Sequence, residues 1–358
     1  MPHDPAIGRG PSFSITLLAS LLAAACSPED VMLAPSGSGF AMRGVSFTSL
    51  RAGQYATADA DLSLANLAAT SANWMALLVT GYQDTAGATV IRQDPFLTPT
   101  DDDLLQAIDR AHRRGLQVLL IPHVDISQEP DRPRSDIGTG FDDASWSAWF
   151  ASYRSFLEHY ATLAENARVD VFSVGTELTT TEPRTAEWRS LIQRVRTVYA
   201  GPLIYGSNWY PGPSTITWWD ELDWIGVDAY FPLSSADHPS AISLWQAWQS
   251  RGELDVLRYL AQRWNRKIVL TEIGYRSIVG AANRPWDFST EAPVDLAAQA
   301  AAYQAALATF WSEPWVAGMF WWNWSPNPRR GGSADTDYTP YGKPAEDLLR
   351  SFYGYQGP

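Results

Sequence analysis

Two glutamates, each at the end of a buried apolar stretch, are the residues of this sequence best suited to do chemistry. Glu177 ends the segment VDVFSVGTE (169–177), and Glu272 ends the segment IVLTE (268–272). Both segments are near-continuous apolar runs, as expected for strands that are buried on both faces. A carboxylate at the end of such a strand costs free energy unless it is paired or has a function. The two segments therefore predict a paired-carboxylate site for acid–base and nucleophilic chemistry.

The alternative for each glutamate taken singly is structural, because a strand-end carboxylate can also form an ion pair with an arginine. The match between the two segments favours catalysis, since each ends its apolar run with the dipeptide Thr-Glu. In the first segment, Gly175 lets the backbone turn where the strand ends. We therefore expect Glu177 and Glu272 to meet at one site.

The elements that must position these glutamates alternate between apolar runs and amphipathic segments from residue 40 to the end. The expected strands are 40–48, 73–80, 117–123, 169–177, 203–208, 222–230, 268–272 and 316–324. The expected helices are 59–71, 100–115, 146–166, 185–199, segments within 241–264, 294–311 and 345–352. Eight such units predict an α/β fold, a single (β/α)8 TIM barrel over residues 40–358. The alternative, a doubly wound open sheet, would normally show a glycine-rich phosphate turn early in the chain.

The longest expected connections follow the third, seventh and eighth strands rather than the helices. In a barrel they would lie on the rim formed by the carboxyl ends of the strands, together with both glutamates. This is the rim on which barrel enzymes carry their active sites.

Four motifs in order resemble glycoside hydrolase family 113, within the large clan of retaining (β/α)8 glycoside hydrolases. They are VGTEL, WIGVDAYFPLS (224–234), LTEIGY and YGKPAEDLL (341–349), and the resemblance covers nearly all of residues 40–353. It implies an endo-β-1,4-mannanase, with a β-mannan or a related β-linked glycan as substrate. In the clan pattern Glu177 is the acid/base, Glu272 is the nucleophile, and Tyr230 hydrogen-bonds the nucleophile and keeps it ionised. The alternative for Tyr230 is a core tyrosine.

Thr176 departs from the pattern of the clan, in which many members place an asparagine directly before the acid/base to bind the sugar 2-hydroxyl. The threonine hydroxyl can donate with a shorter reach, which leaves open whether the substrate is a mannoside, a glucoside or a galactoside. Asp228 lies two residues before Tyr230 and is a candidate supporting residue. On the last strand, alternation places Trp322 and Trp324 on one face, and the face that points into the barrel would bind the sugar.

Further candidates for sugar binding lie at the ends of other strands. Asn208 and Trp209 follow the fifth expected strand, and His123 ends the third. The alternative for His123 is a structural histidine with satisfied hydrogen bonds. The chain also contains 17 Trp and 15 Tyr, whose flat apolar faces and polar edges suit sugar rings.

Composition excludes several other functions. With 26 basic and 39 acidic residues the net charge is −13, which argues against nucleic acid as a partner. The five histidines show no metal-binding spacing, and no nucleotide-binding loop is present, so we expect neither a metal nor another cofactor. The single cysteine, Cys26, permits no intramolecular disulfide. We expect a monomer that binds an oligo- or polysaccharide.

The N-terminal segment predicts export. Residues 1–25 contain a thirteen-residue apolar run typical of a signal peptide, and it stops at LAAAC, which resembles the lipobox of bacterial lipoproteins. The departure is Ala23, where Leu or Val is usual. We expect lipidation at Cys26, a flexible tether over residues 26–39, and a place in the bacterial cell envelope, with simple secretion as the alternative. A lipid anchor would be the only contact with a membrane.

The sequence thus predicts a retaining glycoside hydrolase that cleaves a β-linked polysaccharide with two glutamates. One alternative is a lipid-anchored glycan-binding protein on an inactive barrel, although both glutamates are present. Another is a retaining hydrolase that acts on a different β-glycan or on cell-wall glycan.

Overall fold

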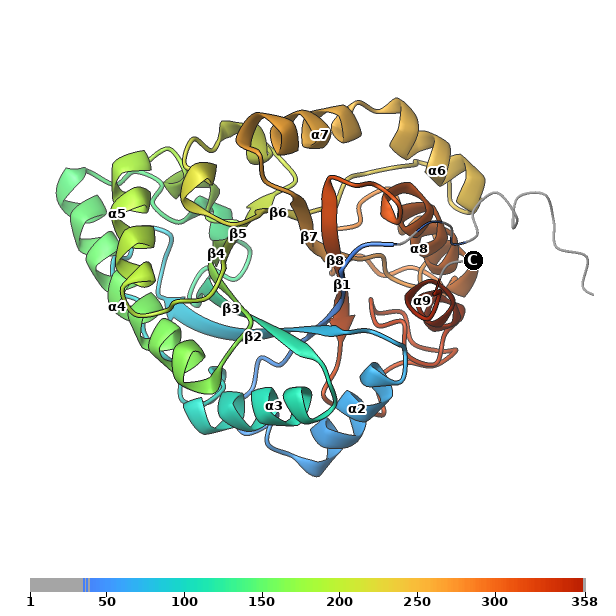
Figure 1. Ribbon diagram of the computed structural model, residues 1–358, viewed down its shortest axis with the longest axis horizontal. Helices are drawn as coiled ribbons and strands as arrows, with labels where there is room; N and C mark the ends of the chain where they lie inside the picture. Colours follow the sequence, from blue (N-terminus) through green and yellow to red (C-terminus); the bar gives the residue numbers. More distant parts are fainter. Residues whose placement is uncertain (1–34, 36, 38, 357–358) are drawn as a thin grey trace, which may run out of the picture. The chain divides into compact units, whose positions relative to one another are not determined.

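Eight parallel strands pair in sequence order and close into a barrel in the computed structural model, which describes residues 35, 37 and 39–356 (Figure 1). The strands are β1 (Met42–Phe47), β2 (Trp74–Gln83), β3 (Gln117–Ile126), β4 (Val171–Thr176), β5 (Leu203–Asn208), β6 (Ile225–Asp228), β7 (Ile268–Ile273) and β8 (Val316–Trp324). The ring closes where β8 pairs with β1. The predicted (β/α)8 barrel is confirmed. The predicted signal peptide, Cys26 and most of the predicted tether lie outside the described residues.

Helices surround the barrel and follow every strand except β5, which leads to β6 through the short 3-10 helices η3 (Pro213–Thr215) and η4 (Trp219–Glu221) (Figure 1). They are α2 (Ala58–Ala68), α3 (Asp101–Arg113), α4 (Asp143–Ala167), α5 (Thr185–Arg196), α6 (Ala241–Ser250), α7 (Glu253–Trp264), α8 (Leu296–Phe310) and α9 (Pro344–Tyr353). The start of α3 shows why the chain turns into a helix there: Thr100 and Asp103 form a reciprocal capping box. No helix in the described part of the chain is long and apolar enough to cross a membrane.

Strands β2 and β3 are longer than the sequence pattern predicts. They pair over ten residues each, past Thr80 and His123, where the apolar runs stop. The polar residue Gln83 fits in the extension because its side chain has partners: it donates to the Thr85 carbonyl oxygen at 2.7 Å and accepts from Trp149 Nε1 at 2.9 Å. Hydrogen-bonded polar groups can be buried at little cost, so the strands continue beyond the apolar pattern.

The core has two layers, one on each side of the sheet. The inner layer fills the barrel with Met42, Trp74, Ala76, Leu78, Leu119, Ile121, Val171, Ile204, Val269, Ala317 and Phe320. The outer layer lies between the strands and the helices and includes Val45, Leu77, Leu120, Phe172 and Leu270. Alternate residues of each strand thus serve the two layers, which explains why the strands are apolar throughout.

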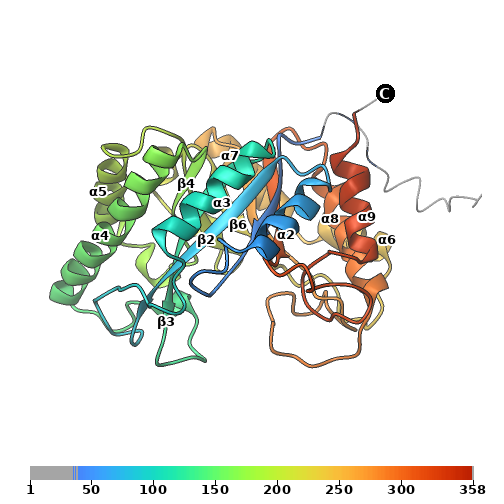
Figure 2. The same cartoon turned by 90° about the horizontal axis from the view of Figure 1, so that it is seen from below.

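The long loops after β3, β7 and β8 gather at one end of the barrel, at the lower edge of Figure 2. Two of them are joined by Lys343, whose Nζ donates to Ser277 Oγ and to Asp335 Oδ1, both at 2.8 Å. Removing one partner of a buried ion pair is destabilising, so Lys343 holds the two loops together. The predicted shared rim is therefore present, and two of its loops are tied together.

Candidate active site

Glu177 follows the last residue of β4 and stands at the carboxyl rim. Its backbone has a φ of 54°, in the left-handed region that a residue other than glycine seldom adopts. The Glu177 N–H donates to the Gly206 carbonyl oxygen on β5 at 2.8 Å, which holds this conformation. The side chain is 22% exposed, so the carboxyl group is open to the barrel mouth.

Glu272 lies within β7 and is more deeply buried, at 6% exposure. Tyr230, two residues beyond the end of β6, donates its hydroxyl hydrogen to Glu272 Oε2 at 2.8 Å. His123 Nε2 lies 3.9 Å from the other carboxyl oxygen, Oε1. Burial lowers the pKa of His123 well below its ordinary value, and Arg134 adds to the effect, so the imidazole is neutral. The structure therefore brings together Glu272, Tyr230 and His123. The sequence analysis placed Tyr230 beside Glu272 but did not place His123 there.

Asp228, the last residue of β6, is fully buried and connects the two glutamate-bearing strands. Its carboxyl accepts a short hydrogen bond from the Thr176 hydroxyl at Oδ2 and one of 2.7 Å from the Thr271 hydroxyl at Oδ1. No part of Asp228 is exposed, so its place in the structure is that of a supporting residue between the strands, and its carboxyl does not reach the barrel mouth. The same bond uses the only hydroxyl hydrogen of Thr176, so direct donation from Thr176 to a sugar would require that bond to break.

The two glutamates interact electrostatically. Burial raises the pKa of Glu177, while Arg134 opposes the rise and Asp125 adds to it. Burial also raises the pKa of Glu272 well above its ordinary value, and the charges of Asp228 and Glu177 raise it further. Each carboxylate therefore disfavours ionisation of the other, and the pair retains a proton at pH values at which an exposed glutamate has lost it.

Arg134, in the short 3-10 helix η1 (Arg134–Asp136) after β3, is a site residue that the sequence analysis did not identify. Its Nη1 lies 3.4 Å from Glu177 Oε2, and its Nη2 lies 2.8 Å from Asp125 Oδ1. The ion pair with an arginine, the structural alternative for a strand-end glutamate, is thus present at Glu177. Asp125 is the closer partner, however, and the pKa of Glu177 is still raised. The ion pair alone does not account for this carboxyl group.

Comparison with known proteins decides the family. The family model described as Glycoside Hydrolase Family 113 matches residues 45–343. This chain belongs to glycoside hydrolase family 113. It is therefore a glycoside hydrolase, and its substrate is a carbohydrate. A search of curated proteins found no match.

Solved structures of family 113 enzymes are similar over nearly their whole length. A GH113 β-mannanase from Alicyclobacillus acidocaldarius, in complex with ManMIm, is 34% identical with a TM-score of 0.79 and covers 88% of this chain and 97% of its own. A GH113 β-1,4-mannanase in a complex structure is 27% identical with a TM-score of 0.79, and the match covers 89% of this chain and 99% of its own. A β-glucuronidase from Ruminococcus gnavus, at 14% identity and a TM-score of 0.53, covers 82% of this chain and 45% of its own and shares the fold alone.

The tryptophans of β8 do not alternate as the sequence predicts for this family 113 hydrolase. Trp322 packs against the inner layer of the barrel, whereas Trp324 is 1% exposed and its Nε1 donates to Ser63 on α2. The expectation that the two rings share a face is wrong. The reason is an irregularity in the pairing with β1, where Val45 is opposite Trp321 and Phe47 is opposite Trp324, so that β8 has an extra residue. The Trp322–Asn323 peptide bond is cis.

Asn208 and Trp209 lie at the rim of the family 113 barrel. Asn208 ends β5 and is aligned with Asp228 on β6. Trp209 stacks on Trp286 from the β7–α8 loop, with ring centroids 4.8 Å apart and planes at 25°. Trp286 is 37% exposed. It could not be identified as a site residue from the sequence, because its loop has no periodic pattern that predicts where a side chain points. Stacked rings with an open edge are surfaces that suit a sugar.

Several polar atoms inside the barrel lack hydrogen-bond partners among the described residues. They are Ser46 Oγ on β1, Thr80 Oγ1 on β2 and His123 Nε2 on β3. Ser46 and Thr80 were not identified from the sequence, since a single hydroxyl residue in an apolar strand carries no distinctive pattern. These three atoms are hydrogen-bonding groups available on the side of the barrel formed by β1 to β3.

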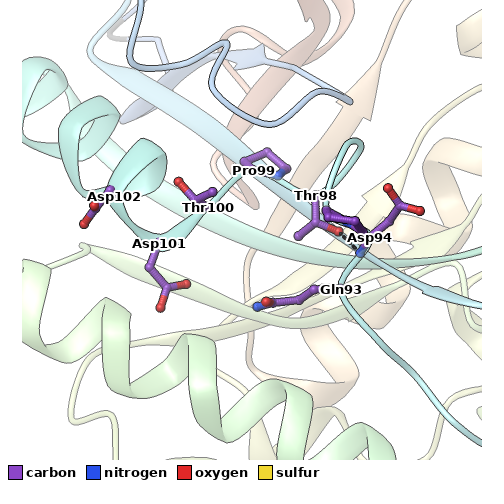
Figure 3. Close-up of a pocket in the computed structure, with 8 residues that line it drawn as sticks. Gln93, Asp94, Thr98, Pro99, Thr100, Asp101 and Asp102 are labelled. Atoms are coloured by element: carbon purple, nitrogen blue, oxygen red, sulfur yellow. Dashed lines mark hydrogen bonds between the residues drawn. The ribbon is translucent and has the colours of Figure 1, made fainter.

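A cavity lies apart from these groups. It has a volume of about 490 Å³ and lies between the β2–α3 loop and the first turn of α3, where Figure 3 shows its polar lining. It is lined by Gln93, Asp94, Pro95, Thr98, Pro99, Thr100, Asp101 and Asp102. None of the predicted site residues lines it. The described residues contain no cluster of three His, Cys, Asp or Glu side chains that could hold a metal ion.

Proposed function

We propose that this family 113 enzyme is a retaining glycoside hydrolase that cleaves β-linked polysaccharide by double displacement, with β-1,4-mannan as its substrate. The observation that carries the proposal is the asymmetric environment of two interacting carboxyl groups. Glu272 is buried and accepts a hydrogen bond from the Tyr230 hydroxyl. The Glu177 side chain is partly exposed at the barrel mouth, and its pKa is raised. The names of similar solved structures, β-mannanase and β-1,4-mannanase, support the choice of substrate.

In the first step the Glu272 carboxylate attacks the anomeric carbon while Glu177 protonates the departing glycosidic oxygen. The bond between the anomeric carbon and that oxygen breaks, and a glycosyl ester with Glu272 forms. The Tyr230 hydroxyl supports the ionised form of Glu272, because a hydrogen bond donated to a carboxylate favours its charge. Burial raises the pKa of Glu177, which favours the protonated form that a proton donor needs.

In the second step Glu177, now a carboxylate, removes a proton from a water molecule that attacks the anomeric carbon. The ester bond to Glu272 breaks and the carboxylate is restored. Two inversions at one carbon give net retention. This mechanism requires the two carboxyl groups to lie about 5 Å apart, since a wider gap would admit a water molecule for direct attack.

The test is a reducing-sugar assay on mannan, glucan, xylan, galactan and peptidoglycan, followed by NMR of the first product. We expect release of sugar ends from mannan and a first-formed product of β configuration. An α-configured first product would contradict double displacement. Cleavage of another polymer without cleavage of mannan would contradict the choice of substrate and leave the reaction class intact.

We also propose that the mature enzyme is held in a bacterial cell envelope by a lipid on Cys26. The support is the sequence alone: residues 1–25 contain a thirteen-residue apolar run, and Cys26 follows it at the end of LAAAC. Mass spectrometry of the mature N-terminus tests this. A diacylglycerol adduct on Cys26 is expected, and an unmodified N-terminus would indicate simple secretion.

A further inference from the structure

Glu182 is a buried carboxyl group that the proposed mechanism does not use. It lies five residues after Glu177, directly after the 3-10 helix η2 (Thr179–Thr181), and is 3% exposed. Among the described residues it has no ion pair with a basic side chain. Burial raises its pKa to about 8, a hydrogen bond from Tyr205 opposes the rise, and the charge of Glu177 adds to it. Near neutral pH this side chain is therefore an uncharged carboxylic acid.

Tyr205, on β5, connects Glu182 to the backbone next to the acid/base. Its hydroxyl donates to Glu182 Oε1 and accepts the N–H of Leu178, and both distances are 2.9 Å. Tyr205 is fully buried, and burial raises its pKa well above the ordinary value, so the hydroxyl keeps its hydrogen. The three groups form a chain of hydrogen bonds in which each bond polarises the next.

This chain acts on the peptide units at Glu177. The N–H of Glu177 binds the carbonyl oxygen of Gly206, and the N–H of Leu178 binds the hydroxyl of Tyr205. Two adjacent residues of β5 thus hold the two successive N–H groups at the point where the backbone takes its left-handed φ of 54°. Such a conformation persists in a residue other than glycine only where the surroundings hold it.

Two tryptophans keep Glu182 and Tyr205 in place. Trp188 and Trp218 stack with ring centroids 4.7 Å apart, and the ring of Tyr205 meets both of them edge-on. Trp218 Nε1 donates to the Glu182 carbonyl oxygen at 3.1 Å, and Trp188 Nε1 donates to the Thr181 carbonyl oxygen at 3.0 Å. Since both rings are fully buried, the segment after Glu177 cannot shift without disturbing this packing.

We propose that Glu182 and Tyr205 are positioning residues, which hold the backbone of Glu177 so that its carboxyl group meets the glycosidic oxygen. The inference rests on the proposed acid/base role of Glu177. Proton transfer in a transition state depends on a hydrogen-bond geometry that a small displacement destroys. Glu182 supplies the acceptor that orients the Tyr205 hydroxyl, and Tyr205 supplies the acceptor that fixes the Leu178 N–H.

The experiment compares Tyr205→Phe, Glu182→Ala and Glu182→Gln with the wild type. The matched control is Tyr199→Phe, which also deletes a buried hydroxyl, here one that donates to the Val169 carbonyl oxygen at 2.8 Å, before the start of β4. kcat/KM is measured on mannopentaose, whose leaving group needs a proton, and on 2,4-dinitrophenyl β-mannobioside, whose leaving group does not. The ratio of the two values isolates protonation by Glu177 from general loss of structure.

For Tyr205→Phe and Glu182→Ala we expect kcat/KM on mannopentaose to fall about 10-fold or more, and that on the aryl mannobioside to fall less than about 3-fold. Glu182→Gln keeps an acceptor oxygen and is expected to restore the wild-type ratio, while Tyr199→Phe leaves the ratio unchanged. Because Tyr205→Phe preserves the ring, it remains informative if Glu182→Ala does not fold. Equal fold losses of kcat/KM on both substrates, or wild-type kinetics in Tyr205→Phe, would overturn the inference. The proposed function would still stand, because the activity of the wild type tests it separately. A wild type that cleaves neither substrate would overturn both.

Discussion

Thr176 and Thr271 donate hydrogen bonds to the two oxygens of a single carboxyl group, that of Asp228. Each threonine directly precedes one of the paired glutamates, on strands β4 and β7. A buried aspartate between these strands therefore fixes the relative positions of the two strand ends. Aspartate suits this place because its two oxygens accept two hydroxyl hydrogens, whereas an asparagine offers only one oxygen.

Replacing Asp228 with Asn should flatten the pH dependence of stability. Burial raises the pKa of Asp228 to about 7, and the charge of Glu177 adds to the rise. Because the folded state binds this proton more tightly than the unfolded state, the stabilisation is complete at low pH and is lost as the pH rises towards 7. Between pH 5 and pH 8 the wild type should lose on the order of 2 kcal/mol more unfolding free energy than Asp228→Asn.

Urea denaturation at the two pH values measures this difference. Glu177, Glu272 and Glu182 titrate in the same direction in both proteins. The variant also lacks the Asp228 charge that raises the pKa of Glu272, which flattens its slope further. Equal slopes in the two proteins would show that Asp228 is ionised throughout this range.

Replacing Glu272 with Ala removes the proposed attacking group. Hydrolysis of every substrate should fall by about 10³-fold or more, because the group proposed to form the glycosyl ester is gone. The control is Glu165→Ala, which removes an exposed carboxylate from the last turn of α4, and it should keep wild-type activity. Initial rates on mannan and on an aryl mannoside measure both effects, and near-normal activity in Glu272→Ala would mean that the nucleophile lies elsewhere.

Replacing Glu177 with Ala removes the proton donor of the first step and the base of the second. The loss should depend on the leaving group: mannan hydrolysis should fall by about 10²–10⁴-fold, while an activated aryl mannoside should still glycosylate Glu272. Azide, which needs no base, should then release a β-glycosyl azide and restore turnover. Rates with and without azide test the role, and equal losses on both substrates without rescue would contradict it.

The fold could be predicted because its signal is distributed along the chain. Each apolar run of a parallel strand is buried on both faces, and eight repetitions of the pattern admit few architectures. The register of β8 could not be predicted, since the extra residue that separates the faces of Trp322 and Trp324 arises from pairing with β1, far away in the sequence.

The site was predictable where its residues end strands and not where they come from loops. Glu177, Glu272 and Tyr230 follow apolar runs that indicate their place on the rim. Arg134 and Trp286 lie in long connections, whose paths depend on tertiary contacts and leave no periodic pattern. The burial of Asp228 could not be predicted either, because the sequence shows only a polar residue near a strand end. It does not show the two threonine hydroxyl groups that donate hydrogen bonds to the carboxyl group.

Replacing Tyr230 with Phe should shift the acid limb of the pH–rate profile to higher pH. The proposed nucleophile works only when ionised, so this limb reports the pKa of Glu272. The Tyr230 hydroxyl donates to Glu272 Oε2 and lowers that pKa against the larger effect of burial. Without the hydroxyl the pKa rises further, and the rate at neutral pH should fall by about 10-fold.

kcat/KM measured from pH 4 to pH 9 on an aryl mannoside reports the pKa in the free enzyme and does not depend on protonation of the leaving group. Tyr153→Phe is the matched control, because it deletes a buried hydroxyl that donates to the Val174 carbonyl oxygen on β4 at 2.7 Å without touching Glu272. Its acid limb should coincide with that of the wild type. An acid limb that stays in place or moves to lower pH in Tyr230→Phe would mean that the hydroxyl does not stabilise the carboxylate form of Glu272.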